Sequence, residues 1–263
     1  FKAHSNILSF NGKTFDLHLL QTRFVLNRLE KVDFDYHFDL LHMSRRIWKH
    51  LSSCSLGNLE KEVLAIKRHD DIPGEDIPKI YFKYLRTKDS ELVAPIFKHN
   101  LIDIVSLLTL LIHLLKVYNE NNDCQLTANE LYNLGRQYEK RKDIEKSIEI
   151  FEEAKNKADK EKNNFELKEE IAINLSWQYK RNEVWEKAVS IWEDMIEKDR
   201  GKLFPYIELA KYYEHKAKDF KIALEYVKIA KDLLREKRVL FDNYQKEREK
   251  LDHRLDRLKK KFN

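Results

Sequence analysis

The second half of the chain repeats one pattern of small, aromatic and aliphatic residues, and this repeat constrains the fold more than any other feature. Three copies lie at residues 131–154, 172–195 and 206–230, the third with one inserted residue. The repeated positions are Leu131, Leu134, Gly135, Tyr138, Ser147, Phe151 and Ala154; then Ala172, Leu175, Ser176, Tyr179, Ala188, Trp192 and Met195; then Tyr206, Leu209, Ala210, Tyr213, Ala223, Val227 and Ala230. Steps of three and four residues describe one face of a helix. Each copy therefore predicts a pair of antiparallel helices that approach closely at the small residue.

The spacing between copies is similar to that of a known repeat family. The small residues Gly135, Ser176 and Ala210 are 41 and 34 positions apart. This resembles the tetratricopeptide repeat, whose unit is about 34 residues long. The resemblance implies an all-α helical solenoid over residues 119–263 and a surface for a protein partner. The predicted capping helix carries its apolar residues at Leu251, Leu255, Leu258 and Phe262.

The predicted capping helix also carries the excess positive charge of the chain. The last 30 residues of the chain hold 11 basic and 6 acidic side chains, a net charge of +5 that equals the net charge of all 263 residues. Such a cluster favours contact with nucleic acid or another acidic partner. A solvated helix face has the same composition, so both interpretations stay open.

The first half follows a different pattern. It holds eight of the ten histidines and three of the four prolines, and the polar stretch at 119–123 separates it from the repeats. Short strands are predicted at 6–10 and 36–43. Helices are predicted at 14–29, 44–51, 56–66, 79–85 and from Pro95 to about 118. Strands that alternate with helices indicate an α/β domain over residues 1–118.

Neither a membrane segment nor a disulfide framework is predicted. The longest apolar run, 104–115, has 12 residues, whereas a membrane span needs about 20. We therefore expect it to be a buried helix. Two cysteines, Cys54 and Cys124, suit a reducing compartment, so a cytoplasmic location without membrane contact is expected.

Two short motifs in the first half carry a further resemblance. Residues 9–16, Ser-Phe-Asn-Gly-Lys-Thr-Phe-Asp, are similar to the second motif of the DEDD exonuclease superfamily, which has an RNase H-like fold. Residues 99–103, His-Asn-Leu-Ile-Asp, are similar to its third motif. With the runs at 38–41, 45–48, 55–60, 68–74 and 77–78, residues 5–115 resemble the YprB-type ribonuclease H-like domain. Members of that family can carry tetratricopeptide-like repeats after the nuclease domain.

The resemblance implies a two-metal nuclease site. Enzymes of this class hold Mg²⁺ or Mn²⁺ with carboxylates, whose hard oxygen ligands suit these ions. By resemblance, Asp16 and Asp103 are metal ligands, and His99 matches the position of the general base. His99 and Asp103 are four residues apart and so share a helix face. The His99 spacing fits the subclass that has tyrosine at this position.

The first superfamily motif, a central strand with Asp-x-Glu, is expected upstream of residue 6. We therefore interpret the chain as the C-terminal fragment of a longer nuclease, with an unpaired sheet edge along residues 6–10 and little or no activity alone. The expected function is metal-dependent phosphodiester hydrolysis on DNA or RNA, as a 3′–5′ exonuclease at a single-stranded end. The alternative is a non-catalytic adaptor that binds nucleic acid or protein and carries a degenerate nuclease domain.

Overall fold

The computed structural model describes residues 6–30, 34–69, 71–119, 125–161, 164–236 and 244–262. The chain forms two compact units, residues 1–134 and 135–263. The predicted boundary at 118/119 falls just after the long helix of the first unit, and the first turns of the next helix also belong to that unit.

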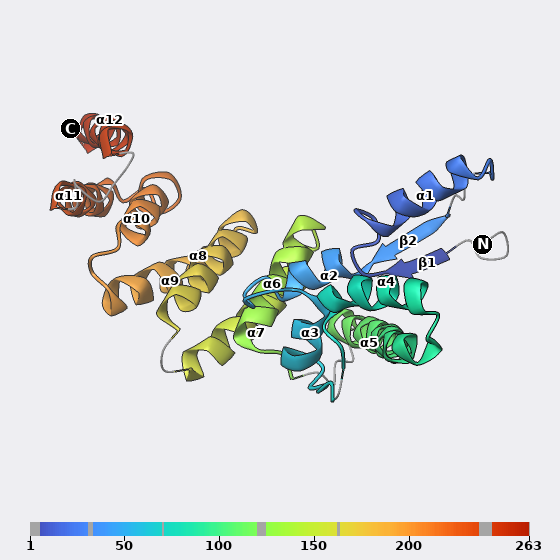
Figure 1. Cartoon of the computed structure of the whole chain (residues 1–263). Helices are drawn as coiled ribbons and strands as arrows, with labels where there is room; N and C mark the ends of the chain where they lie inside the picture. Colours follow the sequence, from blue (N-terminus) through green and yellow to red (C-terminus); the bar gives the residue numbers. More distant parts are fainter. Residues whose placement is uncertain are drawn as a thin grey trace. The chain divides into compact units, whose positions relative to one another are not determined.

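The first unit combines two short strands with five helices that precede the repeats (Figure 1). In chain order its elements are β1 (Asn6–Ser9), α1 (Asp16–Leu26), β2 (Tyr36–Asp39), α2 (Leu40–Ile47), α3 (Leu56–Glu62), a 3-10 turn (Gly74–Asp76), α4 (Ile77–Thr87), a second 3-10 turn (Ser90–Val93) and α5 (Ala94–Tyr118). The strands are parallel, with Asn6 opposite Tyr36 and Ser9 opposite Asp39. Within the described ranges β1 pairs with β2 alone, so its other edge is unpaired, as the sequence predicts.

The predicted second strand, 36–43, is too long. It ends at Asp39, whose side chain accepts a hydrogen bond from the backbone N–H of Leu41 and caps α2. An aspartate at this position satisfies a free N–H at the helix start. Consequently α2 begins at Leu40, four residues before the predicted start of that helix.

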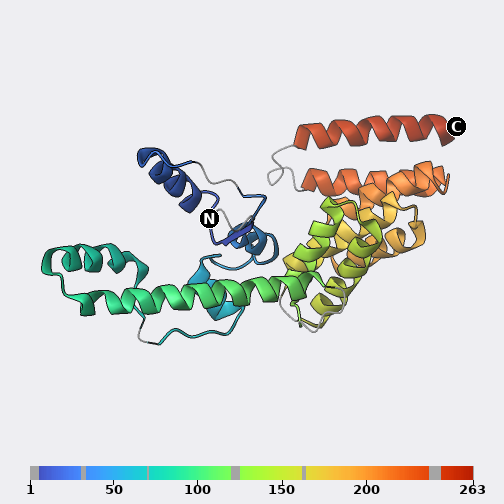
Figure 2. The same ribbon diagram turned by 90° about the vertical axis from the view of Figure 1, so that its right-hand side faces the viewer.

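The prediction that the apolar run 104–115 is buried is only half right. It belongs to α5, a single long helix (Figure 2). One stripe of α5, with Ser106, Leu110, Leu114 and Val117 in it, is buried, and α5 contacts α2 and α3. The other faces of α5 are exposed at Phe97, Leu101, Ile104, Val105, Leu108, Ile112 and Leu115. Apolar spacing in the sequence reports which residues could be buried, but burial itself needs a packing partner.

The stretch Ser90–Tyr118 is also long and apolar enough to cross a membrane by length and composition. The uninterrupted apolar run at 104–115 has only 12 residues, so the sequence did not predict a helix of this length and composition. Length and composition alone do not separate a membrane span from a helix that packs inside a water-soluble protein.

The second unit consists of consecutive helices that pack on their sequence neighbours. They are α6 (Ala128–Lys140, which begins in the first unit), α7 (Ile144–Lys160), α8 (Phe165–Arg181), α9 (Trp185–Lys198), α10 (Leu203–His215), α11 (Phe220–Glu236) and α12 (Tyr244–Phe262). The repeated positions within this unit are buried, except for Tyr138 and Tyr213, which are half-buried. The predicted helix pairs are therefore present, and their small residues lie in the packed interior.

Gly135 shows why the first copy needs a small residue. A Cβ atom at this position would lie 2.8 Å from the ring of Phe151 on α7, too close for van der Waals contact. The hydroxyl of Ser147 donates to the carbonyl oxygen of Gly135 at 3.1 Å. Together these contacts require direct packing of α6 on α7.

The last helix, α12, packs against α11 through buried Leu251 and Leu258 (Figure 1). The side chain of Phe262, a fourth predicted apolar position, lies outside the described side chains. A second, electrostatic attachment joins α12 to α10, where Glu214 is fully buried. Its carboxylate accepts hydrogen bonds from Arg254, Arg257 and Lys261 of α12.

We predict that Gly135→Ala destabilises the second unit. The added methyl overlaps the Phe151 ring, and such overpacking costs about 1–3 kcal/mol, more than the roughly 1 kcal/mol that alanine gains over glycine in a helix. Urea unfolding followed by tryptophan fluorescence measures the change. The matched control is Gly57→Ala on α3, where a Cβ meets nothing within 4 Å. Equal stability of Gly135→Ala and the parent protein would contradict the close approach of α6 and α7.

We predict that Glu214 makes the second unit acid-sensitive. Burial raises the pKa of Glu214, but hydrogen bonds from Arg257 and Lys261 and the charges of Arg254 and His215 outweigh it and lower the pKa to about 2. A lowered folded-state pKa stabilises the fold above the ordinary value of 4.5. This contribution, about 3 kcal/mol, is lost as the pH falls from 4.5 toward 2.

Urea unfolding of Glu214→Gln across this pH interval measures the effect. The variant should lose about 3 kcal/mol at neutral pH and show a flatter acid profile, since its amide does not titrate. The control is Glu247→Gln, which removes an exposed ion pair with Lys250 and should change stability by less than about 1 kcal/mol. An unchanged acid profile in Glu214→Gln would refute the assignment.

Candidate functional site

The turn between β1 and α1 is held by a buried carboxylate. Asp39, only 3% exposed, accepts hydrogen bonds from the backbone N–H groups of Asn11 (2.8 Å) and Lys13 (2.9 Å). Asn11 has a positive φ of 64°, and a Cβ on Gly12 would lie 2.5 Å from the Ser9 side chain. The geometry of this turn therefore favours asparagine at position 11 and requires glycine at position 12, while position 13 contributes its backbone N–H.

This turn sets the position of Asp16, the first predicted metal ligand. The backbone N–H of Leu17 donates to the carbonyl oxygen of Gly12 at 2.9 Å, so the turn runs directly into α1. Asp16 is the first residue of α1 and is exposed. A carboxylate in the first turn of a helix is also stabilised by the helix dipole.

The other two predicted residues lie on α5 and face each other. The Nε2 atom of His99 is 3.5 Å from Oδ2 of Asp103, one helical turn further on. The side chain of His99 is 16% exposed and that of Asp103 is 38% exposed. Both are therefore partly sheltered but open to a ligand.

Arg68, which the sequence analysis did not single out as a site residue, joins this pair to the rest of the unit. Its guanidinium donates to both carboxylate oxygens of Glu60 at 2.5 and 2.6 Å, to Asp71 at 2.8 Å and to Asp103 at 2.6 Å. Glu60 is 1% exposed. These contacts raise the pKa of Arg68, chiefly through the hydrogen bonds to Glu60. The guanidinium thus stays charged between three carboxylates.

Asp71 is not the solvated turn residue that its Asp-Asp-Ile-Pro-Gly context suggests. Its side chain is 9% exposed, and its carboxylate lies 2.9 Å from Nδ1 of His99. Burial raises the pKa of Asp71, but hydrogen bonds from Arg68 and His99 outweigh it, so the pKa is lowered. Its neighbour Asp70 lies outside the described residues.

The Asp71 contact has a chemical consequence for His99. Both ring nitrogens of His99 face a carboxylate, and the shorter contact, 2.9 Å from Nδ1 to Asp71 against 3.5 Å from Nε2 to Asp103, favours the proton of the neutral ring on Nδ1. The Nε2 atom is the one directed at Asp103.

All three predicted site residues line one open cavity of about 1000 Å³. Asp16 reaches it from α1, and His99 and Asp103 reach it from α5. Arg68 and Asp71 line the same cavity. The lining carboxylates of Asp16, Asp71 and Asp103 exceed the two lining cations, Arg45 and Arg68, by one charge, and this excess of negative charge attracts cations.

The described residues do not complete a metal site by themselves. Asp16 and Asp103 supply hard oxygen donors, the type that Mg²⁺ and Mn²⁺ prefer. However, no three histidine, cysteine, aspartate or glutamate side chains in the described part of the chain are placed to hold one ion. One oxygen of Asp103 is also paired with Arg68. We therefore assign no catalytic step to a metal ion in this structure.

Comparison with known proteins agrees with this geometry over the first unit. Residues 1–115 match the RNase_H superfamily. This stretch contains both strands, the Asp39-bound turn and most of α5, so the first unit carries a nuclease-like domain.

A curated relative covers almost the whole chain. The uncharacterized protein YprB of Bacillus subtilis (strain 168) is 34% identical over 261 residues, which are 98% of this chain. The chain spans 61% of the length of that relative. The similarity thus extends through the helical second unit as well as the nuclease-like domain.

Sequence signals existed for two of the missed residues. Arg68 and Asp71 belong to the 68–74 run that carries part of the resemblance. Along the sequence, Arg68 is also the arginine or lysine nearest to Asp70 and Asp71. Glu60 ends the 55–60 run of the same resemblance, but nothing in the sequence indicated its burial, because a glutamate on a short helix is ordinarily exposed. Its burial depends on a guanidinium eight residues later.

We predict that Arg68→Met destabilises the first unit by about 3 kcal/mol, because it leaves the carboxylate of Glu60 buried without a cation. Hydrogen exchange of peptides that cover α3 and α5 measures the loss locally. The matched control is Lys61→Met, whose partner Glu62 is exposed and whose pair contributes about 1 kcal/mol at most. Equal exchange in both variants would show that Arg68 does not hold these helices together.

Proposed function

We propose that the protein containing this chain is a metal-dependent nuclease that hydrolyses phosphodiester bonds, with 3′–5′ exonuclease action at a single-stranded end of DNA or RNA. The observation that carries the proposal is the common cavity of Asp16, His99 and Asp103. These residues come from two motifs that are more than 80 positions apart in the sequence. A fold that served packing alone would not need to bring them to one open cavity.

In this proposal His99 acts as the general base. Asp71 holds the proton on Nδ1 and orients the ring, so Nε2 accepts a proton from the attacking water. Asp71 is a positioning residue, since it acts through His99. Arg68 keeps Asp71 and Asp103 in place through its three-way contact.

Asp16 and Asp103 are proposed ligands of Mg²⁺ or Mn²⁺, together with further carboxylates that the described residues do not supply. When bound, such ions lower the pKa of a water and stabilise the leaving oxygen. The negative charge around Arg68 supports this assignment. The helical second unit, a tetratricopeptide-like domain in this proposal, would bind a protein partner or substrate.

A second candidate is a non-catalytic adaptor. Two observations favour it: Arg68 occupies one oxygen of Asp103, and the described carboxylates form no three-ligand cluster. In such a protein the Arg68 contacts would stabilise a degenerate nuclease domain, and binding would be the function that remains.

The test is hydrolysis of labelled single-stranded DNA and RNA by the full natural protein in Mg²⁺ or Mn²⁺. We expect His99→Ala to reduce kcat by about 100-fold or more, the usual contribution of a general base. Asp16→Asn and Asp103→Asn should abolish activity. The matched control is Asp35→Asn, which changes an exposed aspartate of the same unit that is not among the cavity residues.

The outcomes separate the two candidates. Activity that is lost in the cavity variants and kept in Asp35→Asn supports the nuclease. A folded natural protein with no activity on either substrate favours the adaptor. Full activity in Asp103→Asn would refute the proposed site.

A further inference from the structure

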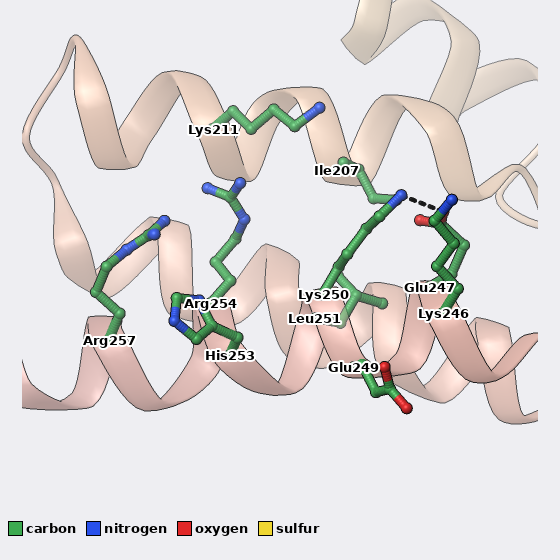
Figure 3. Close-up of a pocket in the computed structure, with 10 residues that line it drawn as sticks. All are labelled: Ile207, Lys211, Lys246, Glu247, Glu249, Lys250, Leu251, His253, Arg254 and Arg257. Carbon is green, nitrogen blue, oxygen red and sulfur yellow. Dashed lines mark hydrogen bonds and ion pairs between the residues drawn. The ribbon is translucent and has the colours of Figure 1, made fainter.

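The second unit has an open groove of about 500 Å³ between α10 and α12 (Figure 3). Its polar lining is mainly basic, with Lys211, Lys246, Lys250, His253, Arg254 and Arg257, and it also contains the two carboxylates of Glu247 and Glu249. Figure 3 shows Arg254 and Arg257 extending from α12 toward α10, while the carboxylate of Glu249 points away. The two guanidinium groups therefore lie between the helices, and the ammonium group of Lys250 pairs with Glu247 at 2.6 Å.

The charges at this groove are not balanced. Buried Glu214 of α10 is surrounded by Arg254, Arg257 and Lys261. Glu208, 4% exposed, likewise accepts from Lys180 and Lys211 at 2.5 and 2.6 Å. Two carboxylates thus face five cations. Of these cations, Lys211, Arg254 and Arg257 line the groove. With Lys246 and Lys250 they place five cations in its lining against the two carboxylates of Glu247 and Glu249, which is an excess of positive charge.

The state of His215 agrees with a positive local field. Burial lowers the pKa of His215, and the charges of Arg254, Arg257 and Lys261 lower it further against the attraction of Glu214. The guanidinium of Arg257 is fixed by two hydrogen bonds to Glu214, at 2.7 and 2.8 Å. A fixed guanidinium loses little side-chain freedom when it binds an anion.

The cations also form a row. Lys246, Lys250, Arg254 and Arg257 are four, four and three positions apart, so they follow one face of α12. At 1.5 Å per residue the row is about 16 Å long. A row of this length matches a linear polyanion, whereas a single small anion would engage only one end of it.

We propose that the groove between α10 and α12 binds the sugar–phosphate backbone of a nucleic acid strand. The choice of nucleic acid over other polyanions rests on the proposed function, and it fits the arginines, whose planar donors pair with phosphate oxygens. The groove binds the backbone without reading bases, since contacts to phosphate carry no sequence information.

The experiment measures binding of fluorescein-labelled single-stranded DNA and RNA of about 16 nucleotides to the full chain by anisotropy, with EDTA present. The test variant is Lys246→Gln with Lys250→Gln. Both lysines are exposed, and neither contacts Glu214 or Glu208 in the contacts above, so the fold should persist, which circular dichroism checks. The control is Lys259→Gln with Lys260→Gln, two exposed lysines of α12 that are not among the groove residues.

We expect the test variant to weaken binding about tenfold at low salt, and to reduce the slope of log K against log salt by about 1.4, the value for two phosphate contacts on a single strand. The control should stay within about twofold of the parent chain. If both variants weaken binding equally, or if neither weakens it, the proposal that this groove binds the strand is overturned. Equal competition by poly-glutamate would overturn the assignment to nucleic acid.

Because EDTA removes divalent ions, this result does not depend on hydrolysis. Loss of nuclease activity with groove binding intact would count against the proposed function alone. Hydrolysis by the natural protein together with no binding at the groove would count against this inference alone.

Discussion

The candidate site depends on one buried ion pair, between Glu60 and Arg68. Glu60 is almost fully buried on α3, and a buried carboxylate without a cation is strongly destabilising. The guanidinium that satisfies it also binds Asp71 in the following turn and Asp103 on α5. A single side chain therefore sets the position of three acidic groups from three separate segments. Asp71 in turn contacts Nδ1 of His99, so the orientation of the histidine ring depends on the same pair.

The two units use buried charge in opposite ways. In the first unit one guanidinium is shared by three carboxylates, which leaves negative charge at the cavity. In the second unit one fully buried carboxylate, Glu214, is shared by three cations, which leaves positive charge at the groove. Each arrangement satisfies the buried group and also creates an electrostatic preference at the surface. The first unit consequently favours cations, and the second favours anions.

Features that depend on short-range pattern could be predicted from the sequence. The repeat predicted the helix pairs of the second unit, because helical spacing and the need for a small residue at Gly135 are local constraints. The three residues that line the cavity were predicted by the resemblance of the motifs at 9–16 and 99–103 to a known superfamily, and not by spacing alone. Their spacing also predicted that His99 and Asp103 share a face of α5.

Features that depend on distant partners could not be predicted in this way. Arg68 meets Asp103 across 35 positions, and Arg257 meets Glu214 across 43, so no local pattern identifies either contact. The same limit explains the error on α5. Its apolar residues cover most of its circumference, and only the packing of α2 and α3 decides that Leu110 and Leu114 are buried while Leu108 and Ile112 are exposed. A hydrophobic sequence specifies the capacity to be buried, and the identity of the buried face is decided by the elements that pack on it.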